Sequence, residues 1–461
     1  MNRHKIIGLL LFATIISLFF QGCKTTQKYK ELQRVACDSL YRDVYSQDTA
    51  NIASLSWRRL FSPKLQALIE EGINNNFDLK IAQARIDAAK ANFKQSQLAF
   101  LPSLNANATA NFQHFSDMQN GNPQIYQLYA NAAWELDIWG KLRSARRAEL
   151  ASLLQSEAYK RYVQTQLISE IASAYYMLES CDAQLDLTLK TVENRKEDVT
   201  AMRLLKESDV VTGAAVVQSE ANRYSAEVTL PDIRQNIREM ENTICLLIGR
   251  NPGTIDRDSL SQETILTALP TGVPSQLLAN RPDIQEAEYQ LRNAFELTRV
   301  ARAYFYPSLT ITAQAGYYNN ALSDFFNPGN FLANIIGGLT QPIFNNGINK
   351  QRLAVAKAQQ EECLQNYKKT WLAAGQEVSN ALYKYQAGRE KANVRAKEIA
   401  SLQKSVEYTQ ALLRYTSNTN YTDVLTSEQS LLSAQLSGIN DRLQQLQAIV
   451  SLYTSLGGGW R

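Results

Sequence analysis

The chain has 461 residues, 20% of them charged, and its 48 basic and 44 acidic side chains leave a formal charge of only +4. So balanced a charge gives no basis for nucleic-acid binding. With two histidines and none of the HExxH, GxSxG, Walker or GxGxxG motifs, the sequence lacks the common catalytic constellations. We therefore predict no enzyme, no cofactor and no metal site.

The N-terminus predicts export and a lipid anchor. Two basic residues precede an apolar run over 6–20, which suits a secretory signal and is too short to cross a bilayer as a helix. The order Gln21-Gly22-Cys23 resembles the lipobox of bacterial lipoproteins, although glutamine is not the usual residue there. This resemblance implies that the signal peptide, residues 1–22, is removed and that Cys23 is lipidated, with palmitate among its acyl chains. The alternative is a conventional signal cut nearby, with Cys23 an ordinary cysteine.

One proline-marked segment occurs twice in the chain. Residues 76–104 align with residues 281–309 without a gap, so that Pro102 corresponds to Pro307, a shift of 205 residues (307 − 102). A repeat this long is not a solenoid, and we interpret it as two half-molecules that pack around an approximate symmetry axis. The predicted organisation is a lipid-anchored extended segment over 23–60, a first repeat over 61–253, a linker over 254–275 and a second repeat over 276–461.

Each repeat contains two runs in which apolar and polar residues alternate, which predicts strand pairs over about 103–137 and about 308–341. Strands of about ten residues with one apolar and one polar face suit an outer-membrane barrel. Four strands cannot close a barrel, and hydrocarbon does not tolerate open sheet edges, so we predict that several copies share one barrel. A small soluble sheet with one face on a core is the alternative.

Long helical hairpins fill the rest of each repeat. Residues 141–212 contain no glycine and no proline, and apolar residues follow three-four spacing along them, as in a coiled coil. Such a helix extends about 100 Å. Polar turn residues over 208–213 and 415–421 predict the two hairpin tips, and glycines within 248–253 and 457–459 predict left-handed caps where the returning helices end.

Two smaller predictions concern caps and cysteines. Asn76 with Asp78, and Arg281 with Asp283, precede helical segments and are interpreted as capping residues rather than functional pairs. The remaining cysteines are widely scattered, so we expect them to be unpaired: Cys37, Cys181, Cys245 and Cys363.

Several segments together resemble a known family. They are SWRRLF at 56–61, FLPSL and FYPSL around the two prolines, WELDIWG at 134–140, QPIFNNG at 341–347 and YTDVLTSEQ at 421–429. With the lipobox, they are similar to the TolC-type outer-membrane efflux family, lipid-anchored multidrug (OprM/NodT-like) branch, over essentially the whole mature chain. The resemblance implies a mainly α fold with a small β part. Coiled-coil hairpins would form a trimeric α-barrel in the periplasm, and four strands per chain would contribute to a shared twelve-stranded transmembrane β-barrel.

The resemblance also implies a function and partners. The chain would be a passive, homotrimeric exit duct for drugs or other small molecules, lipid-anchored in the outer membrane and extending into the periplasm. It would work with a periplasmic adaptor (membrane fusion) protein and an inner-membrane transporter of the resistance-nodulation-division type. Family pores close at the helix tips, which gives these candidates for gating or adaptor contact: Asp209, Arg414, Tyr415, Asn418, Asn420, Tyr421 and Asp423.

The second tip departs from the family's RYxxGxxxYL pattern, because Asn418 stands where glycine is common and the turn is one residue shorter. For each charge at the tips, a solvated helix end is the simpler interpretation. Two other functions remain open: the outer-membrane duct of a type I protein-secretion system, and a lipid-anchored periplasmic coiled-coil scaffold that does not conduct.

Overall fold

The computed structural model describes residues 56–112, 124–263, 281–415 and 421–460. Four residues of the sequence analysis, Cys23, Cys37, Asn418 and Asn420, therefore lie outside the described residues. The chain forms two compact units, and each draws on both halves of the sequence. Unit 1 contains Arg85–Glu157 and Glu286–Lys368, and unit 2 contains the described residues up to Ala84, with Ala158–Gln285 and Lys369–Arg461.

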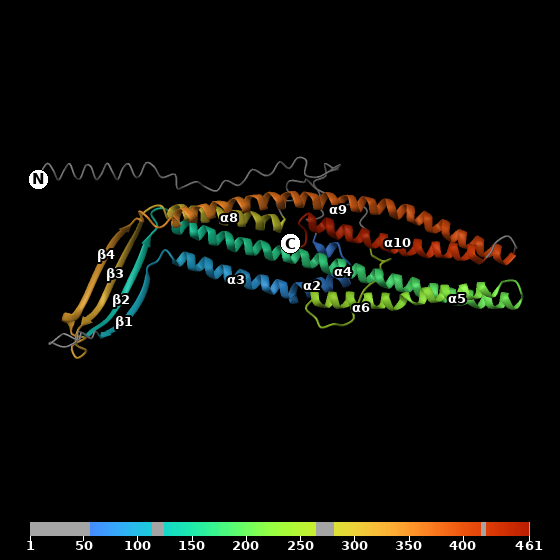
Figure 1. The fold of residues 1–461 in the computed structure, drawn as a ribbon, viewed down its shortest axis with the longest axis horizontal. Helices are drawn as coiled ribbons and strands as arrows, with labels where there is room; N and C mark the ends of the chain where they lie inside the picture. The colour runs from blue at the N-terminus through green and yellow to red at the C-terminus, as the bar shows by residue number, and fades with distance from the viewer. Residues whose placement is uncertain (1–55, 113–123, 264–280, 416–420, 461) are drawn as a thin grey trace. The chain divides into compact units, whose positions relative to one another are not determined.

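Unit 1 contains one antiparallel sheet with strand order β1-β2-β3-β4 (Figure 1). The strands are β1 (Ser103–Phe112), β2 (Gln124–Leu136), β3 (Ser308–Asn319) and β4 (Phe331–Thr340). They match the two predicted strand pairs. Within the described residues, β1 and β4 each pair with one strand only, so the sheet has two open edges.

The register confirms the predicted apolar face. One row across the sheet contains Leu104, Ala132, Ala313 and Ile335, and apolar rows continue on the same face toward both ends of the strands. The opposite face is mainly polar on β1, β2 and β3, with Ile125 and Ala133 of β2 as exceptions. On β4 it is not, because Leu332 and Ile336 point to that face and are more than half exposed. The strict alternation expected for β4 is therefore only half realised.

Unit 1 also contains one part of each of four helices, which are α3 (Phe77–Leu98), α4 (Lys141–Glu207), α8 (Pro282–Ala303) and α9 (Ile348–Tyr415). The amide of Asn293 donates to the carbonyl of Ala148 at 2.8 Å, which ties α8 to α4. The hydroxyl of Thr298 donates to the carbonyl of Ala356 at 3.1 Å, which ties α8 to α9. Side chains that bond to main-chain carbonyls fix the axial position of one helix on another.

Unit 2 contains the two helical hairpins. The first runs from α4 through α5 (Gly213–Glu227) and α6 (Thr229–Leu247), and the second pairs α9 with α10 (Tyr421–Ser455). With 67 and 68 residues, α4 and α9 are each about 100 Å long. The helices end next to the predicted tips. None of the described helices carries an apolar stretch long enough to cross a bilayer.

The returning helix of the first hairpin is interrupted at Val228, which the sequence analysis did not anticipate. Pro231 lies three residues later, and its nitrogen cannot donate to the carbonyl of Glu227. The predicted caps are confirmed: Gly249 and Gly457 have φ of 69° and 87°. Arg250 N–H, just after Gly249, donates back to the carbonyl of Cys245, as in a Schellman motif.

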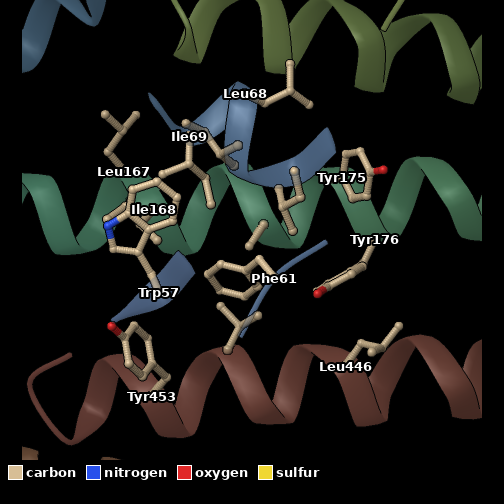
Figure 2. Packing of buried hydrophobic residues seen from close by; sticks show 14 of the residues in the cluster. Trp57, Phe61, Leu68, Ile69, Leu167, Ile168, Tyr175, Tyr176, Leu446 and Tyr453 are labelled. Atoms are coloured by element: carbon tan, nitrogen blue, oxygen red, sulfur yellow. The ribbon is translucent and has the colours of Figure 1, made fainter. Parts of the chain in front are cut away.

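The main core of unit 2 lies between α2 (Pro63–Asn75), α4 and α10 (Figure 2), and buried residues of α6 and α9 extend it. Trp57 and Phe61, from the segment before α2, insert between the helices together with Ile168 and Tyr453. Large apolar side chains here allow the helices to pack without a sheet. Asn76 accepts a hydrogen bond from the N–H of Leu79 at 3.0 Å, which confirms it as a cap. Three cysteines, Cys181, Cys245 and Cys363, are free, as expected.

Candidate functional site

The hairpin tips of unit 2 hold most of the predicted site residues. Asp209 lies in the turn of the first hairpin, where its backbone φ is 56°, and its N–H donates to the carbonyl of Lys206. Tyr415 ends α9 and is 83% exposed, and Asp423 is exposed in the first turn of α10. Arg414 belongs to the last turn of α9. Tyr421 differs from these residues because it is buried.

Tyr421 joins the two hairpins. It belongs to a small apolar cluster with Met202 of α4 and Val216 of α5, and Leu413 of α9 packs against the same cluster. The structure therefore brings Tyr421 together with the first hairpin, whereas Asp209, Tyr415 and Asp423 do not belong to this cluster. Tyr421 is a packing residue here, and its exposed neighbours define the surface.

A cleft of about 1020 Å³ lies beside this cluster. Its walls come from both hairpins and are almost entirely uncharged, with apolar side chains such as Val210, Leu413 and Leu425 alternating with polar ones. The polar ones include Thr212, Gln218, Asn222, Thr422, Thr426, Gln429 and Ser430. Such walls offer hydrogen bonds without strong charge selectivity, which suits the side of another helix better than a small charged ligand.

A charged cluster lies at the base of this cleft. Arg195 of α4 is 5% exposed and forms an ion pair with Glu428 of α10. Asp198, one turn further along α4, lies 3.7 Å from the same guanidinium. Gln410 of α9 donates to Glu428 at 3.0 Å. Burial, reinforced by the negative charge of Glu428, raises the pKa of Asp198 to about 6.

The sequence analysis missed this cluster, although the sequence contains a signal. Arg195 stands between Val192 and Val199 in the three-four series of buried positions on α4, where an apolar residue is expected. A charged residue in such a series indicates a specific partner on the facing helix, because an unpaired buried charge is strongly unfavourable.

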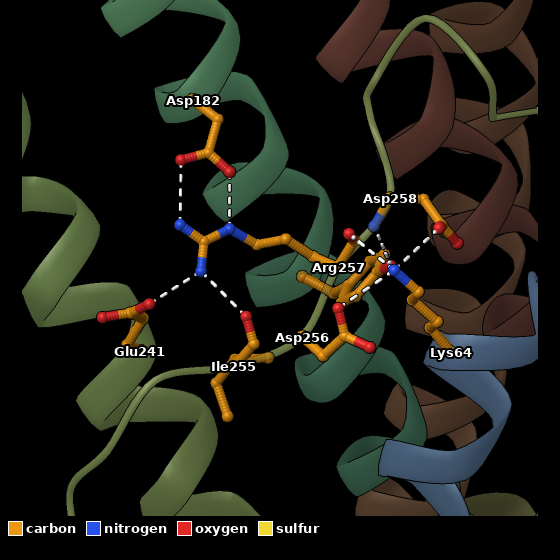
Figure 3. Close-up of polar contacts among 8 residues, drawn as sticks. Lys64, Asp182, Glu241, Ile255, Asp256, Arg257 and Asp258 are labelled. Carbon is orange, nitrogen blue, oxygen red and sulfur yellow. Dashed lines mark hydrogen bonds and ion pairs between the residues drawn. The ribbon is translucent and has the colours of Figure 1, made fainter.

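A second charged cluster fixes the segment that follows α6 (Figure 3). Arg257 donates to both carboxylate oxygens of Asp182 on α4 and to Glu241 on α6, the latter at 2.7 Å. Lys64 of α2 donates to the carbonyl of Arg257 and to Asp256, both at 3.0 Å. Two cations thereby tie one irregular segment to three helices.

Close to this segment, Glu179 is buried, and no cation of the described residues balances its charge. It is 1% exposed, and neither carboxylate oxygen has a hydrogen bond of good geometry. Burial and the negative charge of Glu263, a residue that is 7% exposed, raise the pKa of Glu179 to about 8. The nearby hydroxyl of Tyr175 opposes this shift. Among the described residues, no three histidine, cysteine or carboxylate side chains are grouped to hold a metal ion.

Comparisons with known proteins agree with this architecture. The chain matches the family described as outer membrane efflux protein over residues 68–250 and 273–458. It is 30% identical to the probable efflux pump outer membrane protein TtgC of Pseudomonas putida, covering 98% of this chain and 96% of TtgC. It is 29% identical to the probable outer membrane lipoprotein SilC of Salmonella typhimurium, covering 88% of each.

A solved structure of the outer-membrane channel OprN superposes with a TM-score of 0.87 at 25% identity, covering 95% of this chain and 99% of OprN. Family members are channels for efflux and not enzymes. The helical hairpins, the four-stranded sheet with one apolar face and the extent of these matches together place the chain in the outer membrane efflux protein family, as an outer-membrane component of an efflux system.

Proposed function

We propose that this protein is the passive, homotrimeric exit duct of a tripartite efflux system for drugs or other small molecules. It would act with a periplasmic adaptor protein and an inner-membrane transporter of the resistance-nodulation-division type. The observation that carries the proposal is the sheet, which has a continuous apolar face and two unpaired edges. In hydrocarbon such edges must pair, and no third strand pair is available in the described chain.

The internal repeat supports a particular way of pairing them. Each residue of β1 corresponds to the residue of β3 that is 205 positions later in the sequence. For β2 and β4 the difference is 207 positions (340 − 133), because Ser103 pairs with Ala133 and the corresponding Ser308 pairs with Thr340. Two hydrogen bonds agree with these shifts. Trp134 Nε1 donates to the carbonyl of Phe100 at 2.8 Å. Gln341 Nε2 donates to the carbonyl of Phe305 at 3.2 Å.

The contact between neighbouring copies can have the same strand register as the β2–β3 pair within one chain. In that case β4 of one copy pairs with β1 of the next copy. Within the chain Ala132 faces Ala313; applying the two shifts places Leu339 opposite Ala108 of the next copy. In the same way the pair Leu128 and Tyr317 becomes Ile335 and Phe112. All four shifted residues lie on the apolar face, so this register extends that face from one copy to the next.

Disulfide cross-linking tests this register. In a background that keeps Cys23 for its lipid and lacks the other four cysteines, Leu339→Cys combined with Ala108→Cys should give a covalent trimer on oxidation. Within one chain the two positions lie on β1 and β4, three strand spacings or about 14 Å apart across the sheet and further apart along the strands, which excludes an intramolecular bond. The matched control is Leu339→Cys with Thr109→Cys, which lies on the opposite face. Cross-linking of the control alone, or of neither pair in a folded protein, would contradict the proposed assembly.

Conduction is tested separately by single-channel recording of the purified protein in planar bilayers, with the oligomer mass measured on the same sample. We expect a trimer that opens at least briefly. A stable monomer that never inserts would favour the non-conducting scaffold.

We further propose that the tips and the cleft beside them form the gate and the adaptor contact, with Asp209, Arg414, Tyr415, Asn418, Asn420, Tyr421 and Asp423 as candidates. The walls of the cleft support this assignment, because they combine apolar and polar side chains of both hairpins and carry almost no charge. Thr422→Trp should fill the cleft and weaken co-purification of the adaptor, whereas Tyr408→Trp, at an exposed position of α9 outside the cleft lining, should not. Equal effects would argue against the cleft.

We also propose that Cys23 carries the lipid. The similarity to SilC, which is named as a lipoprotein, supports this. Mass spectrometry of the mature N-terminus should find acylated Cys23, and an unmodified N-terminus elsewhere would refute the anchor.

A further inference from the structure

The cluster around Arg195 links the two hairpins behind their tips. Arg195 belongs to α4 of the first hairpin, and Glu428 belongs to α10 of the second. Side-chain hydrogen bonds continue the link into α9: Gln410 donates to Glu428, and the hydroxyls of Thr409 and Ser427 lie 2.9 Å apart. Any movement that separates the hairpins at this level must break the Arg195–Glu428 pair.

The cluster contains one more carboxylate than it has cations. Arg195 faces both Asp198 and Glu428, while Glu197 of α4 adds a further negative charge nearby. Among the described residues, these are the charged groups that act on Asp198, and an uncharged pair of hydroxyls completes its surroundings. Tyr421 approaches it from α10, and Ser219 of α5 lies beside Tyr421. Ionised Asp198 therefore repels Glu428 across the junction between the hairpins.

We propose that Arg195 is a positioning residue of the duct, and that with Asp198 and Glu428 it forms a proton-sensitive clasp that holds the two hairpins together more tightly when Asp198 is neutral. The clasp itself is a property of this chain; only its effect on conduction rests on the proposed function. At neutral pH the extra charge would weaken the resting arrangement, so that separating the hairpins requires less work.

The direction of the pH effect follows from the pKa of Asp198. Its pKa is about 6 in the folded clasp, against 3.8 for a free aspartate. Protons therefore bind the closed clasp more strongly than separated hairpins, and acid favours closure. If separation restores the free value, the equilibrium shifts toward the clasp by about fourfold between pH 7.5 and 5.5, and by about tenfold between pH 7.5 and 5.

Hydrogen exchange of the full-length protein tests the clasp without requiring conduction. Protection of residues 421–430, corrected for the intrinsic effect of pH on exchange, should rise about tenfold from pH 7.5 to 5. Asp198→Asn should show high protection at both pH values. The matched control is Glu220→Gln, which removes an ion pair to Arg203 inside the first hairpin and should keep the wild-type pH dependence. Protection that does not depend on pH, or a pH dependence that survives in Asp198→Asn, would overturn the proposal.

A charge exchange distinguishes the clasp from simple packing. Arg195→Met leaves Glu428 and Asp198 facing each other, and protection at pH 7.5 should fall at least tenfold. Arg195→Glu combined with Glu428→Arg should restore most of it. Failure of restoration in a protein with normal helical content would assign Arg195 a packing role only.

In planar bilayers, the open fraction of the wild-type channel should decrease from pH 7.5 to 5, whereas the open fraction of Asp198→Asn should not depend on pH. A protein with the exchange response but no conduction would refute the duct and leave the clasp standing.

Discussion

Replacing Glu179 with glutamine should stabilise the protein at neutral pH. The side chain is 1% exposed, its oxygens lack hydrogen bonds of good geometry, and Glu263 places a second carboxylate close to it. Burial and this repulsion raise the pKa of Glu179 from 4.5 to about 8. Glutamine has nearly the same shape and carries no charge, and its amide could donate to Glu263.

The size of the effect follows from linkage. Because the folded protein binds this proton more strongly than the unfolded chain, the contribution of Glu179 to stability is greatest below pH 4.5 and is lost as the pH rises to about 8. The slope for one proton is about 1.4 kcal/mol per pH unit. The loss therefore reaches about 3 kcal/mol at pH 7 and about 4 kcal/mol at pH 8, and Glu179→Gln avoids it.

Thermal unfolding followed by circular dichroism in detergent measures this effect. For a chain of 461 residues, 3 kcal/mol corresponds to about 3 °C in Tm. We expect the gain of Glu179→Gln over wild type to be negligible at pH 4.5 and to increase through pH 7 to pH 8. The control is Glu193→Gln, whose side chain on the same helix is 67% exposed and should change Tm little at any pH. A gain that is absent, or equal at all pH values, would refute the reasoning.

Three further predictions concern packing and ion pairs. Trp57→Ala removes a fully buried indole and should lower the free energy of unfolding by about 3–5 kcal/mol, measured as a lower Tm; an unchanged Tm would contradict the core in Figure 2. Arg257→Met leaves Asp182 and Glu241 without their cation and should accelerate protease cleavage within 255–258 while α4 remains intact, whereas unaltered cleavage would show that Lys64 suffices. Gly388→Val should separate α9 from α10, because a Cβ there would lie 2.9 Å from Gln445 Cγ; a wild-type Tm would show that Gln445 moves aside at little cost.

The helices and strands could be predicted because their signals are local. An uninterrupted stretch from residue 141 with neither glycine nor proline has few alternatives to one long helix, and α4 begins at Lys141 and ends at Glu207. Alternation likewise identified all four strands. The break at Val228 was missed although Pro231 was visible in the sequence. Proline is tolerated in the first turn of a helix, so Pro231 indicates that a new helix begins near Thr229.

The charged clusters could not be predicted in the same way. Arg257 meets Asp182 and Glu241 across 75 and 16 residues of sequence, and nothing local indicates which carboxylate it chooses. Glu179 has no sequence signal at all, because its environment depends on Glu263 in a segment without regular structure. For Arg195 the sequence gives part of the answer. Its position in an apolar series indicates that it has a charged partner, but the sequence does not indicate that this partner is Glu428.

The irregular segment after α6 is held partly through its main chain, besides the side chains of Arg257 and Asp256. Arg442 of α10 donates to the carbonyls of Leu260, Ser261 and Glu263, just as Lys64 and Arg257 donate to carbonyls earlier in the segment. Every amino acid presents the same carbonyl, so these contacts constrain the path of the segment and leave exposed side chains such as Ser261 and Gln262 free to vary. Over evolution, the outer surface at this level could change its chemistry, and so the proteins it meets, without disturbing the helices beneath.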